Sequence, residues 1–212
     1  VIKLVKHLVD NGNAQCVLGN HELNILIHSK REGNGWFFGS PHEDDDKKFN
    51  SKEASLHDRE MIIHFLSTLP LVLESEKIRV VHACWDNASI ASLMKDKSKS
   101  VKEAYDLFTK RIEEHLTKSG IAQKARKEEL GYEFQLKDIY SKVPFLKNLA
   151  HKHVVEQMNN PVKVVTSGTE AFADDMFFAG GKWRMVKRLK WWDQYESDIP
   201  VVVGHYSRNF NK

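Results

Sequence analysis

The sequence is poor in three features that would narrow its class at once: cysteine, net charge and long apolar runs. It has two cysteines, Cys16 and Cys84, so a disulfide framework is not indicated, and we interpret both as small buried residues in a reducing compartment. The net charge of +3 is too small to argue for nucleic acid as a partner. No apolar run approaches the roughly 20 residues of a membrane-spanning helix. We therefore expect a cytoplasmic protein without a membrane partner.

What is present describes a globular chain. Hydrophobic residues make up 41% and charged residues 29% of the 212, which suits one domain with an insertion. The first residue is Val1 rather than Met, and an apolar stripe of helical spacing follows it until Asn11-Gly12. The chain is therefore expected to open inside a helix, as a fragment of a longer protein.

The stretch around which the chain is organised is Gly19-Asn20-His21-Glu22. It follows the short apolar run Cys16-Val17-Leu18 and precedes a helical pattern, Leu23 to Ile27, which predicts a strand, a tight turn and a helix. Glycine lets the backbone turn without a Cβ clash, and ligands of open α/β sheets bind at the carboxyl ends of strands. Asn20 offers a neutral oxygen to a metal, and His21 offers a nitrogen or a titratable proton. The structural alternative is a turn with a capping asparagine and an incidental histidine.

The same layout recurs twice. The β-branched run 78–81 ends in His82-Ala83-Cys84-Trp85, and the run 199–203 ends in Gly204-His205-Tyr206. Three apolar strands would then each deliver a histidine to their carboxyl ends. This pattern predicts that the three meet at one rim of one sheet, as a metal site built from separate strands requires.

These elements, Gly19 to Glu22, Val81-His82-Ala83 and Gly204-His205, resemble in type and order those of the calcineurin-like metallophosphoesterases. The bacterial serine/threonine-phosphatase-like and diadenosine-tetraphosphatase-like members are the more similar ones, as Tyr206 indicates. The resemblance spans nearly the whole chain. It implies an α/β fold: a calcineurin-like β-sandwich core flanked by helices, incomplete at the amino end, with a helical and β-hairpin insertion.

The resemblance also implies the chemistry. In the family, two divalent ions about 3.5–4 Å apart clamp a phosphate and activate a bridging water. Asn20, His82 and His205 match three ligands of the second metal, His21 matches the acid that protonates the leaving oxygen, and Glu22 is an orienting neighbour. We expect a metal-dependent phosphoester or pyrophosphate hydrolase acting on a phosphorylated small molecule or a phosphoprotein. The metal (Mn, Fe, Ni or Zn), the substrate and the oligomeric state stay open.

The sequence also departs from the family. The Asp-x-His and Gly-Asp-x-x-Asp-Arg motifs that supply the first metal are absent ahead of Gly19, where the only acid is Asp10. Leu18 stands where the serine/threonine phosphatases carry an arginine that grips phosphate. The chain would then hold the second-metal half of the site and would be inactive alone. The alternative is a catalytically inactive relative that acts as a binding module.

Elsewhere the patterns predict organisation rather than chemistry. We expect residues 1–85 and 199–212 to form the partial core and 86–198 to form an insertion or cap. A helix is predicted over Ser55 to Leu69, ended by Pro70, and a hairpin joins 71–73 to 78–81. Helices are also predicted over 88–94 and 101–118. The stretches 163–166, 176–178 and 183–189 run apolar or alternate as strands do, with Gly180-Gly181 as a hairpin turn.

Two further groups have open roles. The glycine-containing stretch 30–50, with Trp36-Phe37-Phe38 and the acidic run Glu43 to Asp46, is either a surface loop or a flap beside the site. His151-Lys152-His153 could ligate a metal, but a surface pair is the favoured interpretation.

Overall fold

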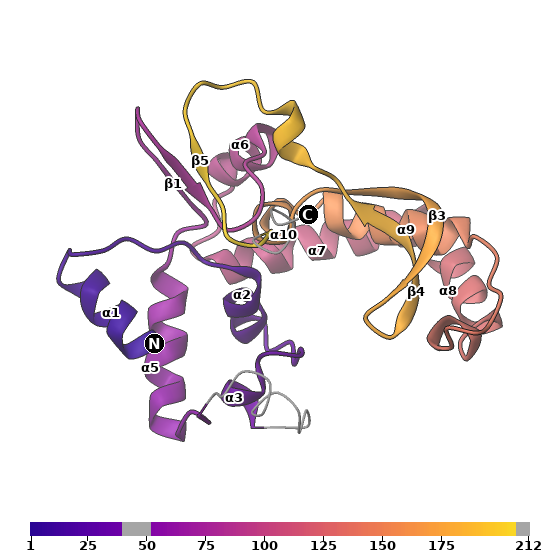
Figure 1. Ribbon diagram of the computed structural model, residues 1–212, viewed down its shortest axis with the longest axis horizontal. Coiled ribbons are helices and arrows are strands. Elements are labelled where there is room, and N and C mark those ends of the chain that lie inside the picture. The colour runs from indigo at the N-terminus through magenta and orange to yellow at the C-terminus, as the bar shows by residue number, and fades with distance from the viewer. Residues whose placement is uncertain (40–51, 207–212) are drawn as a thin grey trace.

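The computed structural model describes residues 1–39 and 52–206 of the chain (Figure 1). It is 50% helical and 13% strand, which confirms a mixed helix-and-sheet fold. Within the described residues, no helix is both long enough and apolar enough to cross a bilayer.

The described residues of the amino-terminal part include the helices α1 (Ile2–Asp10), α2 (Asn20–Leu26), α3 (Gly35–Phe38) and α5 (Leu56–Thr68). The predicted cap of α5 is confirmed, because Ser55 Oγ accepts a hydrogen bond from the Asp58 N–H at 3.1 Å. The buried side chains Leu18, Ile25 and Leu66 belong to one core cluster in this region. Phe37 of the aromatic cluster Trp36-Phe37-Phe38 is buried against the same core, whereas Glu43 to Asp46 lie outside the described residues.

The sheet that positions the candidate site has three strands in the order β1-β2-β5. β1 (Val72–Glu74) and β2 (Arg79–Val81) form the predicted antiparallel hairpin. β5 (Val201–Val202) lies parallel to β2, with Val80 opposite Val202. Because parallel neighbours end at the same edge of a sheet, the residues that follow β2 and β5 emerge side by side.

Residues 87–194 form helices and a long β-hairpin. They comprise α6 (Asn87–Lys95), α7 (Val101–Lys118), α8 (Ile121–Gly131), η1 (Gln135–Lys137), α9 (Lys147–Met158), α10 (Pro161–Ser167), β3 (Glu170–Ala179), β4 (Lys182–Arg188) and η2 (Trp191–Gln194). The Gly180-Gly181 turn between β3 and β4 is as predicted. Figure 1 shows this hairpin with α8 and α9 at one end of the molecule, away from α1. A second core cluster joins Val81 to residues of α6, α10 and η2.

Two expected strands are wrong. Residues 163–166 lie in α10, because Asn160 caps this helix and Pro161 occupies its first turn. Their β-branched side chains are buried in helical form instead. Cys16-Val17-Leu18 is not assigned to a strand: Leu18 N–H donates to the Pro70 carbonyl at 2.8 Å, and Pro70 has no N–H to return a bond. The following helix, α2, begins at Asn20, so the motif itself forms its first turn.

Candidate metal centre

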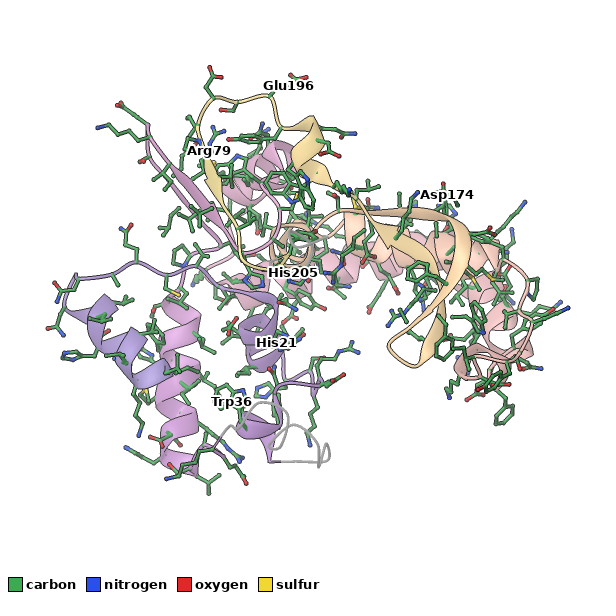
Figure 2. The ribbon with its side chains drawn as sticks, in the orientation of Figure 1. His21, Trp36, Arg79, Asp174, Glu196 and His205 are labelled. Atoms are coloured by element: carbon green, nitrogen blue, oxygen red, sulfur yellow. The ribbon has the colours of Figure 1, made fainter. Side chains whose placement is uncertain are left out.

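The three predicted ligands lie together. His82 Nε2 lies 2.8 Å from Asn20 Oδ1 and 3.2 Å from His205 Nδ1. The two imidazole rings are 5.2 Å apart and nearly perpendicular. Figure 2 places the labelled His205 at the junction between the sheet and α2. The convergence that the sequence predicted is therefore what the structure shows, while the role of these residues as ligands stays a prediction.

Main-chain hydrogen bonds explain why the two histidines meet. His82 directly follows β2, and its carbonyl oxygen accepts from the N–H groups of Gly204 and His205 at 3.1 and 3.0 Å. Those residues follow β5 after one intervening valine, Val203. The parallel pairing of β2 with β5 is therefore extended by two bonds, which fix the backbone of His205 beside that of His82.

Gly19 is required for a reason that the sequence did not reveal. Its φ of −97° is ordinary for any residue, so the backbone conformation does not require glycine here. Instead, a Cβ at this position would lie 2.7 Å from His82 Nδ1 and 2.5 Å from Glu22 Oε2. The absent side chain lets His82 and the Glu22 carboxylate approach the same point. A carboxylate near the second nitrogen of a ligating histidine orients the ring.

His21 lies beside this cluster rather than in it. Its Nδ1 donates to Asn34 Oδ1 at 3.1 Å, and Asn34 Nδ2 donates back to the His21 carbonyl at 2.8 Å. Asn34 is fully buried, so it holds the exposed His21 ring in one orientation. Nε2 of His21 is then the nitrogen left for proton transfer. The sequence did not indicate Asn34.

The electrostatics keep both candidate ligand histidines neutral. Burial lowers the pKa of His205 to about 4, assisted by the positive charge of Arg188 and by the neighbouring His82 and His21. Burial also lowers the pKa of His82, and His21 adds to this, while Glu22 opposes the shift. A neutral imidazole is the form that binds a metal.

Arg188, at the end of β4, is a site residue that motif reasoning missed. Its Nη1 donates to His205 Nε2, and its Nε lies 3.8 Å from Glu170 Oε1. Arginine can only donate, so His205 Nε2 must be unprotonated here and the neutral ring carries its proton on Nδ1. For Nδ1 to bind a metal, that proton must move to Nε2, and Nε2 itself is occupied. Either ring nitrogen of His205 can therefore ligate only after Arg188 has turned away.

The donor set nevertheless suits one divalent ion. Metal–nitrogen and metal–oxygen bonds of about 2.1 Å at right angles separate ligand atoms by about 3 Å, close to the spacing seen here. Within residues 1–39 and 52–206, no group of three or more His, Cys, Asp or Glu side chains is placed to hold a metal. The amide oxygen of Asn20 is what completes a set of three with His82 and His205.

Two neighbouring groups are structural. Burial raises the pKa of the Cys84 thiol to about 12, with Asp86 as a smaller cause, which makes it a protonated core residue as expected. Burial likewise raises the pKa of Tyr206 to about 12. The Tyr206 ring packs edge-on against His205 and Trp192, and its hydroxyl occupies the space that a Gly168 side chain would need.

Comparisons of the chain with protein-family models, with curated proteins and with solved structures gave no match. The motifs and this geometry are therefore what indicates a function. The centre comprises Asn20, His82 and His205, with Arg188 against it, Glu22 behind His82, and His21 at its edge.

Proposed function

We propose that this protein is a metal-dependent phosphoester or pyrophosphate hydrolase with a calcineurin-like core. One observation carries the proposal: Asn20, His82 and His205 come from three separate segments and bring their polar atoms to one point. The order of their motifs along the chain is that of the family it resembles. The described sheet at the centre has three short strands. The complete calcineurin-like β-sandwich is therefore proposed rather than observed.

In this proposal the residues around the centre have different roles. Asn20, His82 and His205 would hold a divalent ion, which when bound polarises a phosphoryl oxygen and activates water. Glu22 orients the His82 ring from its Nδ1 side. Arg188 presents a planar, permanently charged fork that suits two oxygens of a phosphate. In this proposal Arg188 binds phosphate in place of the arginine that the serine/threonine phosphatases carry where this chain has Leu18.

His21 supplies the proton. Its Nδ1 is held by Asn34, so in the protonated ring Nε2–H is the free acid. The ring is exposed and lies near both other histidines, as its effect on their pKa values shows. In this proposal His21 protonates the leaving oxygen, a step worth about 10²–10⁴ in rate.

Arg188 links the binding of the metal ion to the binding of phosphate. While it donates to His205, that histidine is unavailable to a metal. A phosphate that draws the guanidinium away frees the His205 ring. Phosphate and metal should therefore bind cooperatively, each favouring the conformation that the other requires.

The test measures metal-dependent hydrolysis of p-nitrophenyl phosphate and of an alkyl phosphate, in a form of the protein that carries the two first-metal motifs. His21→Asn should lower kcat by about 10²–10⁴, more for the alkyl ester, because its leaving oxygen needs the proton. His82→Ala should lose metal as well as turnover. Equal metal loss in both variants would make His21 a ligand. Unchanged turnover in His82→Ala would refute the proposal.

A binding module without catalysis is the second candidate. The contact between Arg188 and His205 favours it, because it stabilises the centre without an ion. This candidate predicts that phosphate binds equally well with and without metal. The hydrolase predicts that phosphate and metal strengthen one another.

A further inference from the structure

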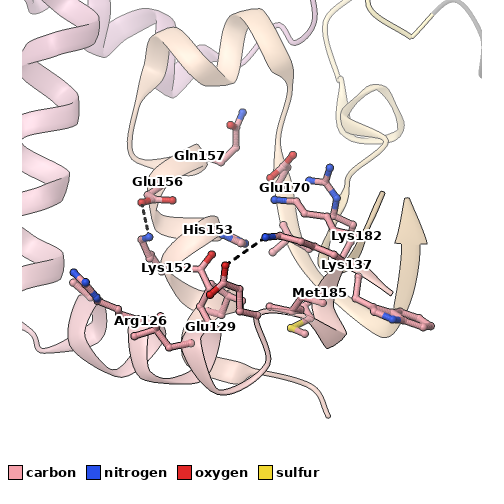
Figure 3. Close-up of a pocket in the computed structure, with 18 of the residues that line it drawn as sticks. Arg126, Glu129, Lys137, Lys152, His153, Glu156, Gln157, Glu170, Lys182 and Met185 are labelled. Atoms are coloured by element: carbon pink, nitrogen blue, oxygen red, sulfur yellow. Dashed lines mark hydrogen bonds and ion pairs between the residues drawn. The ribbon is translucent and has the colours of Figure 1, made fainter. Parts of the chain in front are cut away.

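A cavity of about 850 Å³ lies between α8, α9, η1 and the β3–β4 hairpin (Figure 3). Its volume falls within the range of small-molecule sites, roughly 300–1,000 Å³. Leu136, Leu149 and Met185 contribute buried apolar surface to one wall. The opposing surface is polar, and Figure 3 shows the His153 ring among the charged side chains of α9 and of the hairpin. Asn20, His82, His205 and Arg188 are not among the lining residues, although the lining residue Glu170 lies 3.8 Å from Arg188 Nε.

Positive charge dominates the lining. Seven Lys or Arg side chains face four Glu side chains, an excess of three positive charges. Two lysines are paired, Lys152 with Glu156 at 3.6 Å and Lys137 with Glu133 at 3.4 Å. Among the described residues, the other five cations form no ion pair: Arg31, Arg126, Lys163, Lys182 and Arg184. Unpaired cations gathered around a cavity leave a site in which an anion would be stabilised.

Lys163 is the most informative of these cations. It lies on α10 and is half-buried, with its ammonium 5.8 Å from the centre of the Tyr105 ring. Gln157, which also lines the cavity, donates to the Lys163 carbonyl at 3.1 Å and so fixes α9 against α10. Burial lowers the Lys163 pKa, opposed chiefly by Glu156. Burying an ammonium without a close partner is costly, and a bound anion removes that cost.

The pKa of His153 reflects the positive charges around the cavity. Burial lowers its pKa to about 4, and the positive charges of Lys182, Lys152, Arg184 and Lys163 add to the shift, in that order. Side chains from three elements therefore direct positive potential at one ring. At neutral pH His153 is an uncharged donor or acceptor in the middle of a cationic site.

We infer that this cavity binds an anion that carries two or more phosphate groups, held by Lys163, Lys182 and Arg126. An excess of three positive charges matches a multiply charged anion better than a single carboxylate. The volume exceeds what one inorganic phosphate fills, and the apolar wall leaves room for an organic group on the phosphates. The inference does not depend on catalysis at the metal centre.

The experiment titrates pyrophosphate, ATP and adenosine into the 212-residue chain by calorimetry, without added metal. Saturable binding of pyrophosphate and ATP is expected, with adenosine much weaker. Lys163→Met and Lys182→Met should each weaken binding about 10–100-fold, the usual worth of a charge-assisted hydrogen bond. Lys110→Met, at an exposed lysine of α7 away from the cavity, is the matched control and should change nothing.

Three results would overturn the inference: no saturable binding by the wild type, equal weakening in Lys110→Met, or adenosine binding as tight as ATP. Circular dichroism checks that each variant is folded. If Lys163→Met is unfolded, Lys182→Met decides, because Lys182 is exposed at the rim. As a second readout, the NMR signal of His153 should move on adding pyrophosphate while that of the exposed His151 stays in place.

Discussion

The carbonyl oxygen of His82 accepts hydrogen bonds from the backbone N–H groups of both Gly204 and His205. Two histidines 123 positions apart in sequence are thereby held with their rings 5.2 Å apart. The bonds continue the parallel pairing of β2 and β5, so the backbone positions of the two histidines depend on that pairing. Sites supported by strands are positioned more reproducibly than sites on loops alone.

The two glycines next to the site should respond differently to alanine. In Gly19→Ala the new Cβ would meet His82 Nδ1 at 2.7 Å and Glu22 Oε2 at 2.5 Å. We expect the free energy of unfolding, measured by urea denaturation, to fall by about 1–3 kcal/mol. Gly204→Ala is the matched control, because a Cβ there meets nothing within 4 Å. Equal effects of the two substitutions would show that Gly19 is not required for close approach.

Arg188→Met should raise the affinity for Mn²⁺, because it removes the donor that occupies His205 Nε2. The gain should be at most about tenfold, since Arg188 is exposed and solvent screens its interaction. In the wild type, phosphate should tighten Mn²⁺ binding, and in Arg188→Met this effect should disappear. Calorimetric titrations with and without phosphate measure both. The control is Lys190→Met, which removes a nearby exposed lysine. The same gain in Mn²⁺ affinity in this variant would show that the effect comes from net charge alone.

The roles of residues that depend on their neighbours in sequence were predictable. His82 and His205 follow β-branched runs, and Ser55 precedes a helix that it caps, so their positions follow from neighbours in sequence. Arg188 was not predictable, because nothing in the alternating stretch 183–189 shows that the hairpin leads back to the metal centre. Asn34 was missed for the same reason: its partner His21 is 13 positions away.

The wrong strands also have physical causes. The run Val164-Val165 favours a strand by propensity, but the cap at Asn160 and the buried position of α10 override it. Gly19 was interpreted as a turn residue, whereas steric contact with residue 82 explains it. Contacts between distant segments decide such positions, and a single sequence does not display them.

Acid should destabilise the protein through His153. Its pKa is lowered to about 4 in the folded state, below the ordinary value of 6.5, so the unfolded chain binds more protons between these values. Its contribution to stability is complete above pH 6.5 and is lost as the pH falls from there to about 4. Urea denaturation at pH 7.5 and pH 5 should show a smaller loss for His153→Gln than for the wild type. His151→Gln, on the same helix but exposed, should lose as much as the wild type.

A Mn²⁺ titration of the chain and of its ligand variants tests the proposed metal centre most directly. We expect one weakly bound ion per chain, since Asn20, His82 and His205 are all neutral donors. Binding should fall below detection in Asn20→Ala, His82→Ala and His205→Ala. It should persist in His21→Asn and in His64→Ala, an exposed histidine of α5. A wild-type chain that binds no ion, or a His82→Ala variant that binds as tightly as the wild type, would show that these residues do not form a metal centre.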